Sequence, residues 1–259
     1  MIPFGDYARY YDLLYRDKDY RGEAVFIENI IGDHVPRARR ILELGCGTGA
    51  HGIILAERGF DVVGVDISDR MIDIAKRRTD DVSAKIAQRI RFVCGDARDY
   101  ISADGKFDAV IALFHVASYQ HTNDDLRAMF ATAKANLAPS GIFVFDCWYG
   151  PAVLTERPVV RKKQYADENI SLTRIATPTH LPDLNRVDVE YELQVQDLRN
   201  KKTEKIVEIH RMRYLFRPEL EVFSKNAGLH IVSTGEWMTN REPGLSTWSV
   251  YFVLKQGKN

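Results

Sequence analysis

Three glycines spaced one residue apart, Gly45, Gly47 and Gly49, separate an apolar run from a segment with helical character. Glycine has no Cβ, so a ligand can lie against the bare backbone of this turn, and the following helix offers unpaired N–H groups to an anion. The G-x-G-x-G spacing differs from the dinucleotide fingerprint G-x-G-x-x-G, and the Gly-Lys-Ser/Thr of a phosphate-cradling loop is missing. The turn therefore favours a nucleoside site over a pyrophosphate site.

Two carboxylates follow at spacings that suit the same ligand. Asp66 ends the next apolar run, and Asp96 ends the run after that, within Gly95-Asp96-Ala97. In an open parallel sheet, ligands bind outside the carboxyl ends of the strands. We therefore expect Asp66 to accept hydrogen bonds from both ribose hydroxyls, and Asp96 to lie at the height of an adenine. Taken alone, each motif is also compatible with an ordinary tight or capped turn.

The elements that must position these residues alternate between apolar runs and amphipathic helices as far as Trp148. Predicted strands cover 41–44, 61–66, 90–94, 107–113 and 142–147, and predicted helices cover 50–58, a segment from Ser68 onward, and 124–137. Strands that are apolar on both faces and separated by helices are typical of a parallel sheet covered on both sides. Residues 5–33 are helical in character as well.

After Trp148 the pattern changes to a period of two. Apolar and polar residues alternate over 187–195 and again over 206–216, as in half-buried antiparallel strands. A helix at 217–227 and strands at 229–236 and 247–254 follow. We expect residues 1–150 and 217–259 to form one α/β domain, and 151–216 to form an antiparallel β insertion that covers the substrate site as a lid.

Composition narrows the classes of function. The 259 residues include 36 Lys+Arg and 36 Asp+Glu, so the formal net charge is zero, which disfavours a nucleic-acid partner. No apolar run reaches the roughly 18 residues of a membrane span, so we expect no membrane partner, and no secretion signal is visible. Cys46, Cys94 and Cys147 lie far apart in or beside predicted buried strands. We expect them to be reduced core thiols of a cytoplasmic protein, with no metal site.

Four motifs in order, E-L-G-C-G-T-G, V-V-G-V-D-I-S, G-D-A and F-D-A-V-I-A, resemble the class I S-adenosylmethionine-dependent methyltransferases over residues 35–150. The resemblance implies a Rossmann-like, doubly wound α/β sheet (the seven-stranded methyltransferase fold) and S-adenosyl-L-methionine as cofactor. The cofactor-binding residues that it implies are Glu43, Gly45 and Gly47 at the methionine portion with Cys46 in the same turn, Asp66 at the ribose, Ile67, Met71, Asp96 and Ala97 around the adenine, and Leu113 and Phe114 on the substrate side.

A narrower resemblance runs through the flanking segments. Residues 11–15 with 18–20, the insertion after the fifth strand and residues 208–216 are similar to N-methyltransferases that act on nucleotide-linked amino sugars and make the dimethylamino sugars of macrolide antibiotics. This resemblance places Tyr15 and Tyr20 over the sulfonium side of the site, also as cofactor-binding residues. It implies a small-molecule amine as substrate, and a sheet-rich lid of this kind can mediate a homodimer.

The candidate catalytic residues are Tyr15 and His115. His115 follows Phe114 at the mouth of the predicted site, where it can act as a base or bond to its own loop. The candidate substrate-binding residues are Tyr119, Trp148, Glu208 and His210. The two aromatic residues wall the substrate or pack in the core. Glu208 and His210 lie in the alternating strand. They hold the acceptor if their face of the strand is directed inward, and they face solvent otherwise.

The predicted reaction is methyl transfer from S-adenosylmethionine to a small-molecule acceptor, namely the amine of a nucleotide-linked amino sugar or a similar small amine. An amine requires alignment and a modest proton acceptor, whereas a hydroxyl requires a stronger base or a metal. An O-methyltransferase of a small metabolite and a non-catalytic cofactor-binding regulator are the alternatives. Residues 112–119 lack the Asp/Asn-Pro-Pro-aromatic tetrad of DNA amino-methylating enzymes, and the paired glutamates of protein arginine enzymes are missing.

Overall fold

The computed structural model describes residues 5–257. Its central sheet has the strand order β3-β2-β1-β4-β5, continued by β11 and then β10. These strands are β1 (Arg40–Leu44), β2 (Asp61–Asp66), β3 (Ile90–Cys94), β4 (Phe107–Ala112), β5 (Leu137–Tyr149), β10 (Leu229–Glu236) and β11 (Ser249–Gln256). The strands β1 to β5 pair in parallel, whereas β11 runs antiparallel to β5 and β10 antiparallel to β11. The expected Rossmann-like, doubly wound sheet is confirmed.

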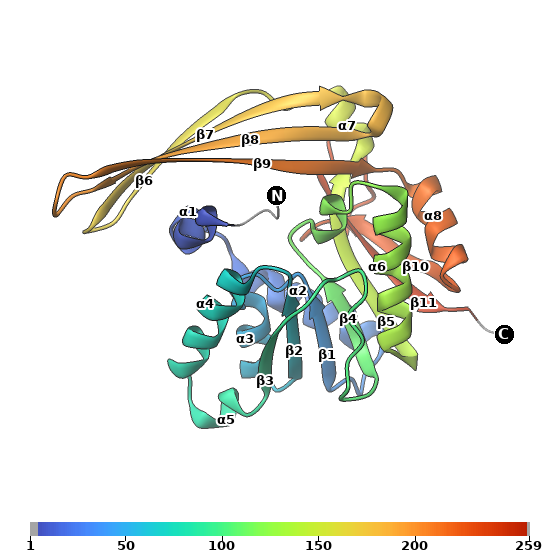
Figure 1. Cartoon of the computed structure of the whole chain (residues 1–259). Coiled ribbons are helices and arrows are strands. Elements are labelled where there is room, and N and C mark those ends of the chain that lie inside the picture. The colour runs from blue at the N-terminus through green and yellow to red at the C-terminus, as the bar shows by residue number, and fades with distance from the viewer. Residues whose placement is uncertain (1–4, 258–259) are drawn as a thin grey trace.

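Helices cover this sheet on both sides (Figure 1). The helical elements are η1 (Asp6–Tyr10), α1 (Tyr11–Leu14), α2 (Tyr20–His34), α3 (Ala50–Glu57), α4 (Asp69–Asp80), α5 (Ala84–Ala87), η2 (Val116–Tyr119), α6 (Asn123–Asn136), α7 (Gly150–Thr155), η3 (Pro182–Leu184) and α8 (Arg217–Asn226). Side chains alternate along each strand, so Leu42 and Val110 belong to one buried apolar cluster while their neighbours Ile41 and Ala109 belong to another. Burial on both faces explains the near-continuous apolar runs of the sequence.

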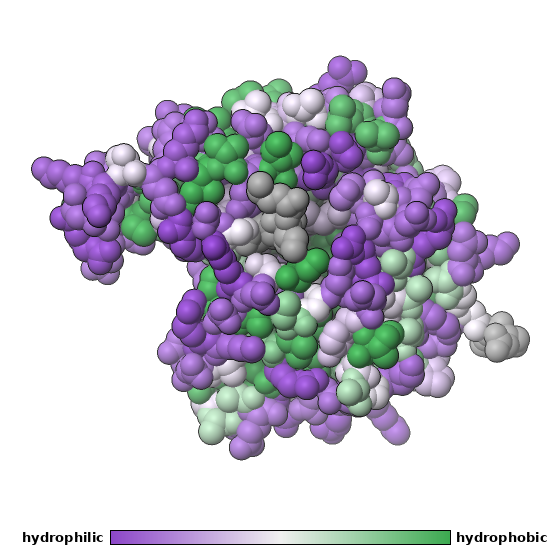
Figure 2. All heavy atoms as spheres, in the orientation of Figure 1, coloured by the Kyte–Doolittle hydropathy of each residue, from purple (hydrophilic) through white to green (hydrophobic). Residues whose placement is uncertain are grey.

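Four further strands make an antiparallel sheet, which we call the lid. They are β6 (Arg161–Ala166), β7 (Ile170–Leu181), β8 (Arg186–Asp197) and β9 (Thr203–Leu215), paired in that order. The lid joins the central sheet where Trp148 and Tyr149 pair with the end of β9. Figure 1 shows it lying across the carboxyl ends of the parallel strands, with α1 beneath it. Its free end carries the two hairpin turns and is hydrophilic in Figure 2.

Three local expectations need correction. The helical stretch 5–33 is broken at Tyr15–Asp19, because the Asp19 side chain caps α2 by accepting a 2.8 Å hydrogen bond from Gly22 N. The predicted strand 142–147 begins earlier, since β5 already starts at Leu137. Cys94 is exposed, because it ends the edge strand β3, whereas the other two cysteines are buried.

Within residues 5–257, no helix combines the length and apolar character needed to cross a bilayer. The same part of the chain contains no cluster of three or more side chains suited to holding a metal ion.

Candidate active site

The glycine turn lies at the carboxyl end of β1, and its three glycines serve different purposes. All three have positive φ, +71° at Gly45, +54° at Gly47 and +77° at Gly49. A Cβ at Gly45 would lie 2.4 Å from Val116, and one at Gly49 would lie 2.4 Å from Phe92. A Cβ at Gly47 would meet nothing within 4 Å. The expected bare surface for a ligand is therefore at Gly47, while the space at Gly45 is filled by the protein itself.

Asp66, at the end of β2, ties this turn to the next helix. Its Oδ2 accepts a hydrogen bond from Gly47 N, and its Oδ1 accepts one from Ser68 N, both at 2.9 Å. Burial raises the pKa of the carboxyl group above its ordinary value, and the two backbone donors oppose this shift. Ser68 also caps α4 by accepting a hydrogen bond from Met71 N. The carboxylate is thus fixed at the edge of the cavity described next.

A cavity of about 500 Å³, which we call the main cavity, opens above the carboxyl ends of the strands and beneath the lid. Thirteen of the predicted site residues line it: Tyr15, Gly45, Gly47, Asp66, Ile67, Met71, Asp96, Ala97, Leu113, Phe114, His115, Tyr119 and Trp148. Tyr20 and Cys46 line a much smaller adjoining hollow beside the glycine turn. The parallel sheet therefore brings residues from β1, β2, β3 and β4 to one surface, as its topology predicts.

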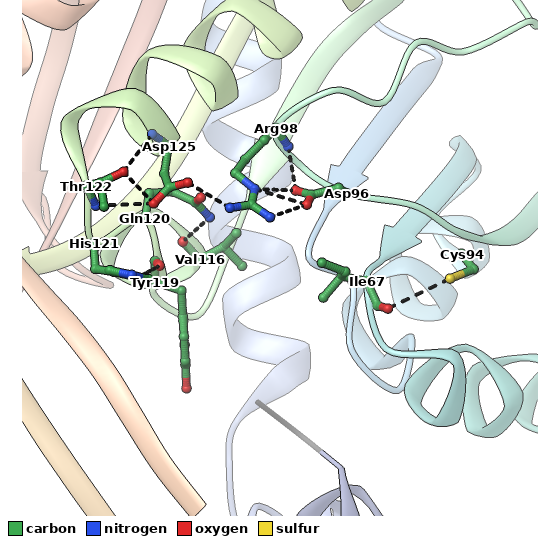
Figure 3. Close-up of polar contacts among 10 residues, drawn as sticks. All are labelled: Ile67, Cys94, Asp96, Arg98, Val116, Tyr119, Gln120, His121, Thr122 and Asp125. Atoms are coloured by element: carbon green, nitrogen blue, oxygen red, sulfur yellow. Dashed lines mark hydrogen bonds and ion pairs between the residues drawn. The ribbon is translucent and has the colours of Figure 1, made fainter. Parts of the chain in front are cut away.

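One end of the main cavity carries an ion-pair network (Figure 3). The Arg98 guanidinium contacts both oxygens of Asp96, with Nε at 2.9 and 3.0 Å, and its Nη1 lies 2.7 Å from Asp125 Oδ1. These contacts lower the pKa of Asp96 against the opposing effect of burial. Asp125 in turn closes the capping box of α6 with Thr122. Arg98 thus links the loop after β3 to the segment that follows β4, a role that its sequence context did not suggest.

Glu43 is the predicted cofactor residue that does not reach either of these hollows. Its side chain is 1 % exposed, beneath the glycine turn. Burial, together with the nearby Asp66 charge, raises the pKa of Glu43 to about 8. His51 lies between this carboxyl and Glu23, with Nδ1 3.7 Å from Glu43 and Nε2 2.7 Å from Glu23. The structure therefore places Glu43 in a support beneath the turn.

His115 lines the main cavity just after Phe114. Phe114 and His115 have positive φ values of +61° and +67°. Asp146 of β5 holds this conformation, since its Oδ1 accepts a 3.0 Å hydrogen bond from His115 N. His115 Nδ1 lies 2.7 Å from Asp146 Oδ2, and Ser249 Oγ donates to the same oxygen at 3.4 Å. The histidine is therefore bound to the neighbouring strand and not to its own loop.

Tyr15 and Phe114 meet edge to face, with ring centroids 5.0 Å apart. Tyr20 packs against His51 beside the glycine turn, and burial raises the pKa of its phenol. The two tyrosines line different hollows, Tyr15 the main cavity and Tyr20 the smaller one beside the glycine turn.

The face of β9 that bears Glu208 and His210 is directed inward, which was one of the two alternatives for this strand. Glu208 and His210 are 8 % and 2 % exposed, whereas Ile209 between them is 49 % exposed. His210 Nδ1 lies 2.8 Å from the hydroxyl of Tyr119, and Glu208 accepts a hydrogen bond from Tyr7 N. Neither Glu208 nor His210 lines the main cavity. Their contacts support Tyr119 and the N-terminal helical turn, so their predicted contact with a substrate is indirect in this arrangement.

A second cavity of about 360 Å³, the lid cavity, lies between the lid and β5. It shares His115, Trp148, Arg174 and Tyr191 with the main cavity. Cross-strand pairing puts Arg161 and Lys163 of β6 opposite Ala176 and Arg174 of β7, on the inner face of the lid. Among the residues that the structure describes, no Asp or Glu lines this cavity. Within residues 5–257, none of its three cations forms an ion pair with a carboxylate.

Sequence reasoning missed these lid residues and Asp146. Arg174 donates to the hydroxyls of Tyr7 and Tyr15 at 3.3 and 3.4 Å, and lies 5.5 Å from the ring centroid of Tyr191. Tyr191 does share the alternating face that was recognised in β8. The cations of β6 and β7 lie in a stretch with no motif, and only strand pairing brings them together.

Comparison with known proteins agrees with this geometry. Residues 41–141 match the family described as "Methyltransferase domain". The methyltransferase YqeM of Bacillus subtilis (strain 168) is 28% identical over 97% of this chain and 96% of its own length. A dTDP-3-amino-3,4,6-trideoxy-alpha-D-glucopyranose N,N-dimethyltransferase of Streptomyces venezuelae is 27% identical over 87% of this chain and 91% of its own length. The SAM-bound structure of CalS10, an amino pentose methyltransferase from Micromonospora echinaspora, superposes with a TM-score of 0.74 at 25% identity, covering 99% of both chains.

The fold, the open glycine turn and these similarities define a class I S-adenosylmethionine-dependent methyltransferase. Within that class, the chain resembles the amino-sugar N-methyltransferases. The residues present fit S-adenosylmethionine as cofactor, because Gly47 leaves an open surface and Ile67 and Met71 supply apolar walls on the same cavity.

Proposed function

We propose that this methyltransferase methylates the amine of a nucleotide-linked amino sugar, with the cofactor in the main cavity and the phosphates of the substrate in the lid cavity. Glu43 and Cys46 would support the glycine turn, Gly45 and Gly47 would border the methionine portion, and Asp66 would bind the ribose. S-adenosylmethionine supplies an already activated methyl group, so the protein mainly has to align the acceptor and exclude water. The lid is the element that can do both, because it closes over the shared wall of the two cavities.

The observation that carries the proposal is the charge of the lid cavity. Arg161, Lys163 and Arg174 converge on one space that no carboxylate of the described residues lines. Three cations without a carboxylate partner repel one another and favour an anionic ligand, and a phosphate group accepts several such charge-assisted bonds. Several relatives are named for dTDP-linked amino sugars, whose diphosphate has this character.

The shared wall also supports an amine as acceptor. A cation at Arg174, beside Tyr15 and Tyr191, disfavours a second positive charge nearby and so favours the neutral, nucleophilic form of an amine. Tyr119 and Trp148 would border the acceptor, and the phenol of Tyr15 would lie on the side of Phe114 and the cofactor.

A methyl-transfer assay with mass spectrometry tests this function. The acceptors are dTDP-3-amino-3,6-dideoxy-α-D-glucopyranose, the corresponding free amino sugar, and a dTDP-sugar that has a hydroxyl in place of the amine. We expect one or two methyl groups on the nitrogen of the nucleotide-linked amine and little turnover of the other two. Transfer only to the hydroxyl compound would establish an O-methyltransferase. Binding of S-adenosylhomocysteine without any methylated product would establish a non-catalytic regulator.

A further inference from the structure

The loop after β4 carries a histidine whose two ring nitrogens lie in different surroundings. His115 Nδ1 is buried and lies 2.7 Å from Asp146 Oδ2. The side chain as a whole is 21% exposed and lines both the main cavity and the lid cavity. Since Nδ1 is covered, the exposed part of the ring is the side that bears Nε2. A carboxylate beside Nδ1 favours the tautomer in which Nδ1 carries the proton and Nε2 keeps its lone pair.

We propose that His115 and Asp146 form a proton-accepting pair for the acceptor amine, with His115 Nε2 as the acceptor atom and Asp146 as the positioning residue. The inference rests on the proposed function, because it takes an amine as the substrate. An amine that arrives as its ammonium ion has no lone pair and must first lose a proton. His115 lies where the two cavities join, which is where an amine would lie if phosphates occupied one cavity and the cofactor the other.

The chemical step balances without a further reactant. An N–H bond of the ammonium group breaks, and the proton moves to His115 Nε2 while Asp146 stabilises the resulting imidazolium. The freed lone pair then forms the N–C bond as the C–S bond to the methyl group breaks, with its electron pair going to sulfur. The products are a methylammonium ion and an uncharged thioether, and His115 passes its proton to water. The same deprotonation prepares the methylated amine for a second transfer.

Asp146 suits this role because it is itself fixed. It is 1% exposed, Oδ1 accepts the backbone N–H of His115, and Ser249 donates to Oδ2. The backbone contact anchors the carboxylate relative to the ring that it orients. Besides His115, the charged or titratable side chains that line the lid cavity are Arg161, Lys163, Arg174 and Tyr191. Those that line the main cavity are Tyr11, Tyr15, Asp66, Asp96, Arg98, Tyr119, His121, Arg174, Tyr191 and Arg211. Its two carboxylates are bound elsewhere, Asp66 by backbone N–H groups and Asp96 by Arg98, so Asp146 is the carboxylate that contacts the imidazole.

The first experiment compares D146N, H115A and the double variant in methylation of dTDP-3-amino-3,6-dideoxy-α-D-glucopyranose. D146N keeps an oxygen for the backbone N–H but turns an amide N–H toward Nδ1, which reverses the tautomer. We expect kcat to fall about 10²–10⁴-fold in D146N and in H115A, with the affinity for S-adenosylhomocysteine unchanged. The double variant should match H115A, because Asp146 acts through His115. The control T234A removes a hydroxyl that donates to Tyr251 O at 2.9 Å, outside both cavities, and should stay within about 3-fold of the parent enzyme.

The pH dependence separates proton transfer from a structural role. The loss of kcat in H115A should become smaller as pH rises, because the amine is then already neutral in solution. A deficit of constant size across pH, or additive losses in the double variant, would overturn the proposal.

A measurement without substrate keeps this test distinct from that of the proposed function. Nitrogen-15 NMR of the histidines, at about pH 9 where an ordinary imidazole is neutral, should show the proton of His115 on Nδ1. In D146N it should move to Nε2. The same tautomer in both proteins would contradict the pair, whatever the acceptor proves to be.

Discussion

The two walls of the active-site region are built in different ways. The wall supplied by the parallel strands is defined largely by the backbone, with Asp66 bonded to two N–H groups and Gly47 open to the cavity. The lid wall is defined by side chains that project from alternate positions of antiparallel strands, such as Arg174 and Tyr191. A backbone site suits a ligand that does not vary, whereas a side-chain site can be altered residue by residue. The comparison indicates a fixed cofactor and an adjustable acceptor.

The largest effect should come from the glycine turn. Gly47 and Gly59 both have positive φ, and a Cβ added at either position would meet nothing within 4 Å, but only Gly47 faces the main cavity. G47A and G59A should lose similar stability, about 1–2 kcal/mol each. G47A alone should weaken the binding of S-adenosylhomocysteine, by about 10²-fold, because the methyl group occupies ligand space. Calorimetry measures both affinities, and equal losses would mean that the turn is only structural.

Glu43 gives a prediction about stability and pH. Its carboxyl pKa rises from the ordinary value of 4.5 to about 8 on folding, so the folded state binds more protons between these values. The free energy of unfolding should therefore fall as pH rises from about 4.5 to 8, by roughly 5 kcal/mol at most. E43Q should flatten this slope in denaturant titrations at several pH values. An unchanged slope would show that another group is responsible.

The lid can be tested by charge. R161Q/K163Q should raise KM for the nucleotide-linked amino sugar about 10–100-fold, since two charge-assisted contacts to phosphate are lost. The affinity for S-adenosylhomocysteine should not change. K162Q is the matched control, because Lys162 lies between these residues in β6 and projects from the other face. A similar rise in KM for K162Q would assign the effect to net charge alone.

The smallest effect concerns the ion-pair network in Figure 3. R98Q should weaken cofactor binding about 3–10-fold, because Asp96 loses the partner that orients it. R91Q removes a comparable exposed pair with Asp104, outside the main cavity, and should have no effect on this affinity. Both affinities can be measured by the same calorimetric titration. Equal affinities in the two variants would show that Arg98 does not contribute to cofactor binding.

The cofactor-binding wall of the main cavity could be predicted from the sequence, because its residues follow the ends of strands. Gly47, Asp66 and Asp96 each end an apolar run, and parallel topology brings such ends together. The roles assigned to individual residues stay predictions, and Glu43 lies beneath the site instead of on its wall.

The strands of the lid could be predicted from the sequence, but the binding site that their side chains form could not. The position of Arg161, Lys163 and Arg174 around one cavity depends on the register between strands, which a period of two does not specify without the turns. Asp146 was visible only as a polar residue in an apolar strand, and its partner His115 lies 31 positions away. Contacts of this kind arise from tertiary packing, so spacing along the chain gives no signal for them.

Calorimetric titration of one sample with S-adenosylhomocysteine and then with dTDP tests whether the cofactor and the nucleotide phosphates occupy separate cavities. If the two cavities hold the cofactor and the phosphates separately, dTDP will bind to the protein already loaded with S-adenosylhomocysteine, and R161Q/K163Q will weaken only the second binding event, by about 10–100-fold. Displacement of S-adenosylhomocysteine by dTDP, or no binding of dTDP at all, would contradict the account.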